Sequence, residues 1–219
     1  MQKKSDNPSR DFFGRADYVS IIILLVLSLA LFSQVLLHPG WMISPGYDLV
    51  SAYTPWKFFT HETFAKYGQL PFWYNTAFSG TAFLGNLSVS MFFYPFNIFF
   101  LIFPPDPVFG FLYMIHLFLA GLWMYLFLKY KNLTRLAALI GAMSFMFSSP
   151  MVSKLFEGGL TNLFAISWVP LVFLSFELMF RKRNLISTIL FGIVLALQFH
   201  ASMIQIFFYT CVSISIYLL

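Results

Sequence analysis

The feature that most constrains this fold is a series of apolar runs long enough to cross a lipid bilayer. Residues 18–37 form the first run, and an α-helix of about 20 apolar residues spans the hydrocarbon core. After a long, more polar stretch the pattern returns. The sequence therefore predicts an all-α polytopic membrane protein with about six transmembrane helices, and the later five lie at residues 109–128, 136–152, 163–180, 185–199 and 202–219.

Composition excludes a soluble domain. The chain is 59% hydrophobic and only 10% charged, whereas a soluble protein is about 25% charged. Its net charge of +5 comes from short basic clusters between apolar runs, as membrane topology requires, so we expect contact with membrane lipids and no nucleic-acid partner. Cys211 is the only cysteine, which excludes a disulfide framework.

The first apolar run is predicted to be a permanent anchor. It is longer than the 7 to 15 residues typical of a signal-peptide core, and no small-residue cleavage site follows it. Residues 1–17 are then a basic tail on the cytoplasmic side. At the other end the chain stops at Leu219 within an apolar run. That ending is typical of a sequence that continues, and we expect a C-terminal truncation.

Residues 87–103 are ambiguous, because this apolar run is short and contains Pro95 and Asn97. If the run crossed the bilayer, the basic loop at residues 129–135 would lie outside, against the positive-inside rule. An interfacial or re-entrant segment instead places the basic tail and both basic loops inside. We therefore expect a cytoplasmic N-terminus, an external region at residues 38–108 and a five-helix membrane bundle at residues 109–219. The Lys and Arg residues left outside are Lys57, Lys66 and Lys154.

The external region is predicted to be a structured cap, because it combines many Gly, Pro and Asn residues with aromatic side chains. Its motifs are Pro45-Gly46-Tyr47-Asp48, Tyr53-Thr54-Pro55-Trp56, Gly68-Gln69-Leu70-Pro71-Phe72-Trp73, Phe78-Ser79-Gly80, Leu84-Gly85-Asn86 and Phe93-Tyr94-Pro95-Phe96-Asn97.

The order of these motifs resembles the first external loop of bacterial YfhO-type membrane proteins. Phe147-Ser148-Ser149 and Trp168-Val169-Pro170-Leu171 extend the resemblance downstream. It implies a GT-C type glycosyltransferase fold in the bacterial cytoplasmic membrane, of which this chain is the N-terminal part. The implied donor is a polyprenyl-phosphate-linked sugar, and the implied acceptor is a cell-envelope polymer or lipid. The chain departs from the family pattern after Glu157 and at His200-Ala201-Ser202.

Asp48 is the leading candidate for catalysis, since glycosyl transfer needs a base for the acceptor hydroxyl. We expect Tyr47, Tyr53 and Trp56 to shield its carboxylate partly from water. Asp48 is also the candidate ligand for a divalent cation that would hold the donor phosphate, although there is no Asp-x-Asp pair. The structural alternative is that Asp48 caps a helix that begins near Leu49.

Several further residues are candidates for the site. Glu157 is a possible second catalytic carboxylate, with a solvated loop charge as the alternative. Lys57 would bind the phosphate of the donor, unless the external lysines are simply exposed. His200 would contact the same phosphate, unless it faces headgroup water. The complete predicted substrate-binding set is Lys57, Tyr53, Trp56, Asn86, Asn162 and His200.

Other polar groups in the apolar runs bear on the choice of function. His116 falls inside a predicted span, where an ionisable group marks either a functional site or a bond to a neighbouring helix. Glu177 and Arg181 are four residues apart and are predicted to pair for structure. No nucleotide-binding motif is present, so the donor should be a lipid. The competing hypotheses are a transporter or lipid flippase, and a non-catalytic assembly partner.

Overall fold

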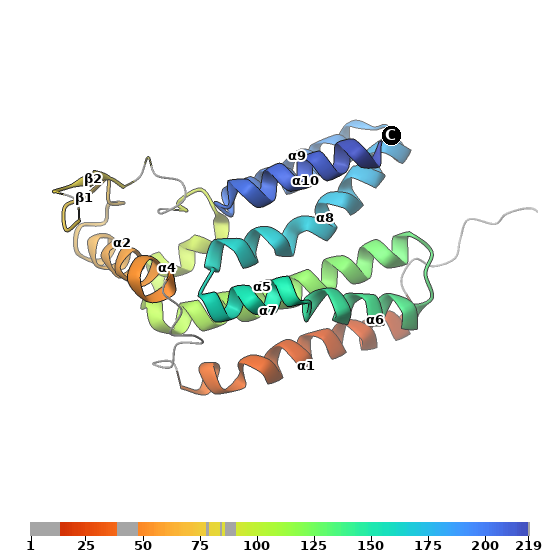
Figure 1. The fold of residues 1–219 in the computed structure, drawn as a ribbon, viewed down its shortest axis with the longest axis horizontal. Helices are drawn as coiled ribbons and strands as arrows, with labels where there is room; N and C mark the ends of the chain where they lie inside the picture. Colours follow the sequence, from red (N-terminus) through yellow and green to blue (C-terminus); the bar gives the residue numbers. More distant parts are fainter. Residues whose placement is uncertain (1–13, 39–47, 78, 84, 86–90, 219) are drawn as a thin grey trace, which may run out of the picture.

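The protein is a bundle of long, roughly antiparallel helices with a smaller folded region over one end (Figure 1). The computed structural model describes residues 14–38, 48–77, 79–83, 85 and 91–218. Among these the only β-structure is the antiparallel pair β1 (Trp73–Tyr74) and β2 (Thr81–Ala82). The described part is therefore almost entirely helical, as its long apolar runs predict.

Four helical stretches are long and apolar enough to span a membrane. They are α1 (Arg15–Leu37), α5 (Pro105–Tyr130), the pair α6 (Arg135–Met146) and α7 (Ser149–Glu157), and α8 (Leu160–Lys182). The shorter apolar helices α9 (Leu185–His200) and α10 (Ile204–Tyr217) lie beside α8. These helices indicate a multi-pass membrane protein.

The run at residues 136–152, predicted as one helix, is broken. α6 ends at Met146, and α7 begins three residues later with Pro150 in its first turn. Proline has no N–H for the carbonyl four residues earlier, and its ring clashes with that carbonyl, so a continuous helix is disfavoured here. α7 then runs on to Glu157, where Gly158 takes a left-handed conformation (φ +73°) and turns the chain into α8.

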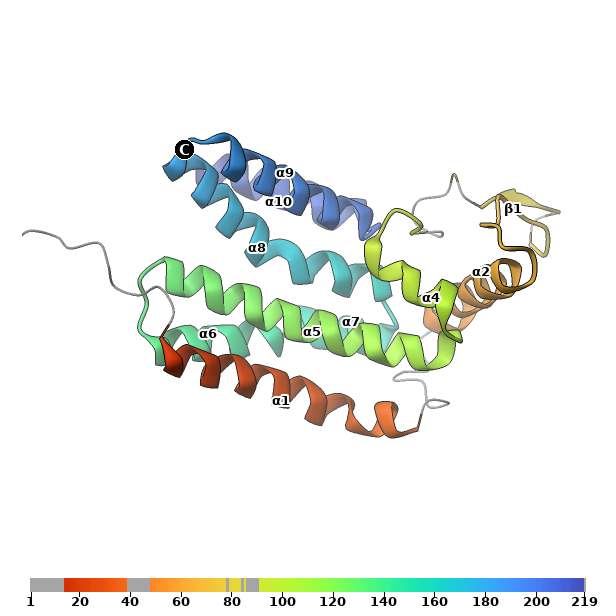
Figure 2. The same ribbon diagram turned by 180° about the vertical axis from the view of Figure 1, so that it is seen from behind.

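Helix α5 is the central element of the bundle. It packs between α1 and α8 and also contacts α6, as the view from behind shows (Figure 2). Its fully buried Leu112, Leu117 and Ala120 belong to the main core. Gly110 lets α1 approach closely, since a Cβ at this position would lie 2.6 Å from the Cγ1 atom of Val35. Small residues at helix contacts commonly serve this purpose in membrane bundles.

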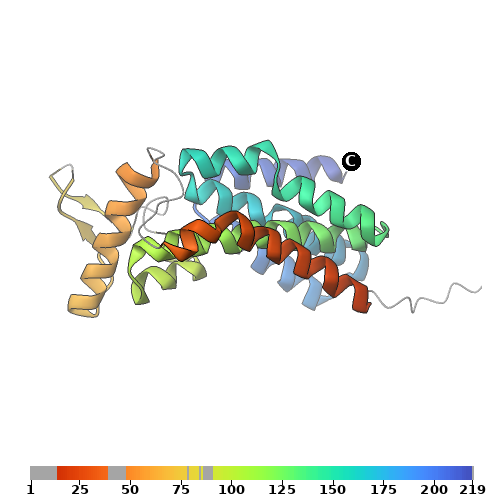
Figure 3. The same ribbon diagram turned by 90° about the horizontal axis from the view of Figure 1, so that it is seen from below.

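The region over the bundle end is built from short elements, and we call it the cap. Helix α2 (Thr54–Tyr67) runs across the direction of the bundle, with the strand pair beyond it (Figure 3). The described residues 91–103 form only the short helices η2 (Pro95–Ile98) and α4 (Phe99–Ile102). At about 1.5 Å rise per residue, these helices are far too short to cross a bilayer.

The ends of α1 and α5 fix the relative direction of these helices. The Nζ atom of Lys129, near the end of α5, lies 3.3 Å from the Asp17 carboxylate at the start of α1. The hydroxyl of Tyr125 donates a hydrogen bond to the same carboxylate. α1 and α5 are therefore antiparallel neighbours, and the cap that connects them lies at the opposite end. We call this opposite end the basal end.

Candidate functional site

Asp48 lies at the cap end of the bundle, immediately before a short π-helix, η1 (Leu49–Tyr53). Its side chain is exposed and makes no capping hydrogen bond to the helix that follows. The prediction that a helix starts near Leu49 is confirmed, but the capping role for Asp48 is wrong. Tyr47, one of the three residues expected to shield Asp48, lies outside the described residues. π-Helical turns are rare and often occur at functional sites.

Two tyrosine hydroxyls lie within the electrostatic reach of Asp48, and a third hydroxyl bonds to one of them. The hydroxyls of Tyr53 in η1 and Thr161 in α8 form a hydrogen bond of 2.8 Å. The Asp48 charge acts on the hydroxyls of Tyr53 and of Tyr113 in α5. Burial, with a smaller contribution from Asp48, raises the pKa of Tyr53. We call Asp48, Tyr53, Tyr113 and Thr161 the Asp48 cluster.

Tyr113 is the unusual member of this cluster. It is fully buried in the centre of α5, and its hydroxyl has no hydrogen-bond partner in the described part of the chain. A buried polar group without a partner is costly, and its presence in a native fold calls for an explanation such as a bound water or ligand group. Neither Tyr113 nor Thr161 was predicted, because a single hydroxyl in an apolar run carries no functional signal.

Lys57 is not placed as predicted. It was expected to bind a phosphate or to lie exposed, but it is fully buried between α2 and the segment that carries η2 and α4. Its ammonium group donates a hydrogen bond of 2.9 Å to Asn97 and lies over the ring of Phe100. Burial lowers the pKa of Lys57 to about 7. Lys57 therefore joins two parts of the cap and presents no charge at a surface.

The second predicted carboxylate lies at the end of α7. Glu157 forms an ion pair of 2.5 Å with Lys154, one helical turn before it, and its side chain is 55% exposed. Such a pair on the surface contributes little to stability. This arrangement agrees with the alternative of a solvated charge, and a catalytic role for Glu157 stays a prediction.

The remaining predicted site residues lie at the same end of the bundle. Trp56 is half-buried and packs edge-to-face on Tyr53, with ring centroids 6.0 Å apart. Asn162 is half-buried beside Thr161 in the first turn of α8. His200 is half-buried at the end of α9, with its ring 5.7 Å from that of Phe93. Asn86 lies outside the described residues.

A buried network, which sequence reasoning recognised only through His116, fastens the cap to the bundle. The hydroxyl of Tyr94 accepts a hydrogen bond from the indole of Trp168 in α8. The Nδ1 atom of His116 lies 2.7 Å from the Leu112 carbonyl and must donate to it, so Nε2 accepts from Tyr94. His116 also stacks on Phe164, with centroids 3.7 Å apart. Its ring nitrogens are both used for structure.

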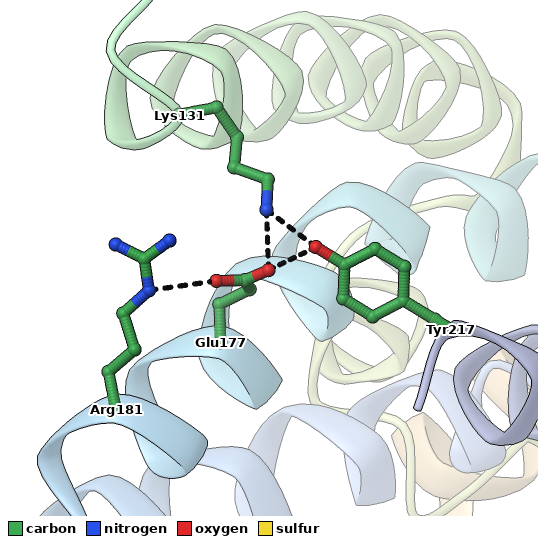
Figure 4. Close-up of polar contacts among 4 residues, drawn as sticks. All are labelled: Lys131, Glu177, Arg181 and Tyr217. Atoms are coloured by element: carbon green, nitrogen blue, oxygen red, sulfur yellow. Dashed lines mark hydrogen bonds and ion pairs between the residues drawn. The ribbon is translucent and has the colours of Figure 1, made fainter. Parts of the chain in front are cut away.

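At the basal end, Glu177 of α8 joins three elements (Figure 4). Its carboxylate accepts from Lys131 at 2.5 Å and from the hydroxyl of Tyr217 in α10, and it lies 3.2 Å from Arg181. The predicted pairing of Glu177 with Arg181 is confirmed. The hydrogen bond to Glu177 raises the pKa of Lys131. The Glu177 carboxylate is held by all three neighbours. Its role in this cluster is therefore structural.

The described residues do not assemble a metal site of the usual kind. They contain no group of three His, Cys, Asp or Glu side chains able to hold one ion. Asp48 alone could supply a single carboxylate, and a cation there would need its other ligands from the donor phosphate and water. The donor set of the described residues does not fit a cation site built by this part of the chain.

A bundle of membrane-length helices with a folded cap over one end defines the class: a multi-pass α-helical membrane protein. No family model matches the chain, and no curated protein or solved structure matches it either. The resemblance to YfhO-type proteins therefore rests on the motifs alone. In the structure, Asn97 of one of those motifs bonds within the cap, and Tyr94 of the same motif bonds the cap to the bundle.

Proposed function

We propose that this protein is a membrane glycosyltransferase, or the N-terminal part of one, that uses a polyprenyl-phosphate sugar donor and an external cell-envelope acceptor. The observation that carries the proposal is the exposed Asp48 carboxylate beside buried hydroxyls at the cap end of the bundle. The Asp48 carboxylate makes no capping hydrogen bond to the helix that follows it. The motif resemblance supports the same assignment.

In the proposed reaction, Asp48 takes the proton of the acceptor hydroxyl as its oxygen attacks the anomeric carbon of the hexose. The new glycosidic C–O bond forms while the bond between the anomeric carbon and the phosphate oxygen breaks. Polyprenyl phosphate leaves with the bonding electrons. General-base assistance of this kind contributes about 10²- to 10⁴-fold to a rate.

An apolar cleft supports a lipid-linked donor. It has a volume of about 320 Å³ and lies where α4 meets the start of α5. Its lining is almost wholly apolar, as the hydrocarbon chain of a polyprenyl carrier requires. The lining residues are Phe99, Phe103, Pro104, Pro107, Val108 and Phe111.

The decisive experiment is sugar transfer by the full chain in lipid vesicles, measured with a labelled hexose on polyprenyl phosphate. Asp48→Asn keeps the size of the side chain but removes its ability to take a proton. We expect turnover to fall about 10²-fold or more. The matched control is Glu62→Gln, which neutralises another exposed acid in the cap. Full turnover by the Asp48→Asn variant would contradict the assignment.

The orientation is also part of the proposal, with six spans, the basal end in the cytoplasm and the cap outside. The basic loops at the basal end support it through the positive-inside rule. Asn132 is exposed in one of these loops. With Cys211→Ser as background, an Asn132→Cys variant should resist an impermeant thiol reagent added to intact cells. Ready labelling would reverse the orientation.

The transporter alternative rested on the helical bundle and on His116 as an intramembrane ionisable group. Both of its ring nitrogens are occupied, one by Tyr94 and one by a backbone carbonyl of its own helix. His116 therefore gives no support to a transport pathway. The glycosyltransferase is the single function that we propose.

A further inference from the structure

The basal end carries a one-sided distribution of exposed charge. The acidic residues described there are Asp17 and Glu177, and both are buried and paired with basic side chains. By contrast, several basic side chains at this end are exposed, so the surface that water or lipid meets is positive. The exposed basic residues described there are Arg15, Arg135, Arg181, Lys182 and Arg183.

Arg183 has a backbone conformation that glycine adopts more readily than other residues. It follows the last residue of α8 and has a left-handed backbone conformation, with φ +47°. Side chains other than those of Gly and Asn are disfavoured in this conformation. Arg183 makes no ion pair among the described residues, and its guanidinium lies 5.8 Å from the ring of Phe180. Backbone strain at an exposed, charged side chain points to a role outside the fold.

Arg135 is also placed against the preference of its helix. It is the first residue of α6, where the N–H groups and the helix dipole are positive. Thr134 already provides the cap, by accepting a hydrogen bond from the backbone N–H of Ala137. A cation at this position therefore adds electrostatic repulsion without making a local bond. Arg135 and Arg183 share one property: each is exposed, and neither forms an ion pair among the described residues.

The surroundings of the two arginines are apolar rather than polar. Leu133 and Leu136 flank Arg135, and Leu185 and Ile186 follow Arg183, with all four exposed. Basic side chains next to exposed apolar ones suit the boundary between headgroups and acyl chains, where the apolar part is buried and the charge reaches a phosphate. Both loops lie at the same end of the bundle, so one membrane surface meets both (Figure 1).

We propose that Arg135 and Arg183 bind the headgroup phosphates of anionic phospholipids, which makes the basal end an interaction surface for an anionic leaflet. The guanidinium group suits this ligand, because its N–H groups match the oxygens of a phosphate. The proposal concerns the end opposite the Asp48 cluster and is independent of glycosyl transfer.

The test compares the binding of spin-labelled phosphatidylglycerol and phosphatidylcholine to the full chain in phosphatidylcholine vesicles. The wild-type chain should prefer phosphatidylglycerol. Arg183→Gly and Arg135→Gln should each reduce this preference by up to about fivefold, and the double variant by more. The matched control is Asn132→Gly, since Asn132 is also left-handed (φ +64°) and exposed at this end but carries no charge.

Two outcomes would overturn the proposal. One is a double variant that keeps the wild-type preference for phosphatidylglycerol. The other is a preference that millimolar inorganic phosphate abolishes at constant ionic strength, because a free-phosphate site rather than a lipid surface would then explain it. Thermal unfolding in phosphatidylcholine vesicles checks the fold, and Arg183→Asn provides a second variant that suits the left-handed conformation. We expect neither Arg183 variant to unfold at a lower temperature.

Discussion

The two ends of the bundle use charge in opposite ways. At the basal end the acids Asp17 and Glu177 are buried, and basic side chains surround them. At the cap end a base, Lys57, is buried on a neutral amide, while the acids Asp48 and Glu157 are exposed. Ion pairs therefore join the helices at the basal end. At the cap end, hydrogen bonds among Tyr94, His116 and Trp168 connect the cap to the bundle instead.

This difference has a physical basis. A buried carboxylate is tolerated only when several donors compensate for its lost hydration, and Glu177 has three such donors. At the cap end, Tyr94, His116 and Trp168 connect the cap to the bundle without any charge. The Asp48 carboxylate is thus not needed to hold the fold together.

The largest expected effect concerns the buried base. Lys57 has a pKa of about 7 in the folded chain and an ordinary value of 10.5 when unfolded. Between these values the unfolded state binds more protons, so this residue makes stability rise with pH from about 7 upward. Relative to Lys57→Met, wild-type stability should increase by up to roughly 4 kcal/mol between pH 7 and pH 10.

This pH dependence is measured as the difference between wild-type and variant denaturant unfolding in detergent micelles at each pH. Lys66→Met is the control, because Lys66 is exposed in the same helix. Its difference from the wild type should not change with pH. Parallel curves for the wild type and the Lys57→Met variant would show that the buried base does not distinguish the two ends.

The neutral network should give the next largest effect. His116→Phe keeps an aromatic ring against Phe164 but removes the acceptor for the Tyr94 hydroxyl and the donor to the Leu112 carbonyl. We expect a loss of about 2–3 kcal/mol in the free energy of unfolding, because buried polar groups are left without partners. His200→Phe is the control, since that ring is only half-buried, and its loss should stay below about 0.5 kcal/mol.

The ion pairs at the two ends can be compared directly. Glu177→Gln should destabilise the chain by about 1–2 kcal/mol. This loss is smaller than for a fully buried pair, because water partly screens the exposed Lys131 and Arg181. Glu157→Gln removes a surface pair at the cap end and should cost less than about 0.5 kcal/mol. Unfolding in high salt should shrink both losses. Equal losses for the two variants would remove the contrast between the ends.

The hydrogen bond in the Asp48 cluster should have a smaller effect than the buried network at either end. Thr161→Val removes the partner of the Tyr53 hydroxyl and should cost about 1 kcal/mol. Adding Tyr53→Phe should recover most of this loss, since both polar groups are then absent. A double-mutant cycle of unfolding free energies measures the coupling. Additive losses would mean that the two hydroxyls do not share a hydrogen bond.

Much of the helical framework was predictable. The runs at residues 18–37, 163–180 and 185–199 correspond within a few residues to α1, α8 and α9. The break between α6 and α7 was missed, although Pro150 was a local signal for it. Pro170 gives no such break and lies inside the continuous α8. A proline alone therefore does not decide whether an apolar helix continues.

The candidate site was less predictable. Asp48 was recognised from its place between an apolar run and an aromatic motif, but its neighbours Tyr113 and Thr161 come from helices far along the chain. The burial of Lys57 was also missed, because its partner Asn97 is 40 residues away. Hydropathy patterns report the average polarity of a segment. They do not report which two side chains meet.

The sequence by itself determined that this chain is a membrane protein, where its long helices run and where its positive charges gather, since these follow from apolar length and local charge. Only the tertiary structure decided that Lys57 is buried, that both ring nitrogens of His116 are bonded, that Asp48 is exposed and that the Tyr113 hydroxyl has no partner within the described part of the chain. The reason is that burial and hydrogen bonding of a polar side chain depend on groups distant in sequence, which meet only when the helices pack.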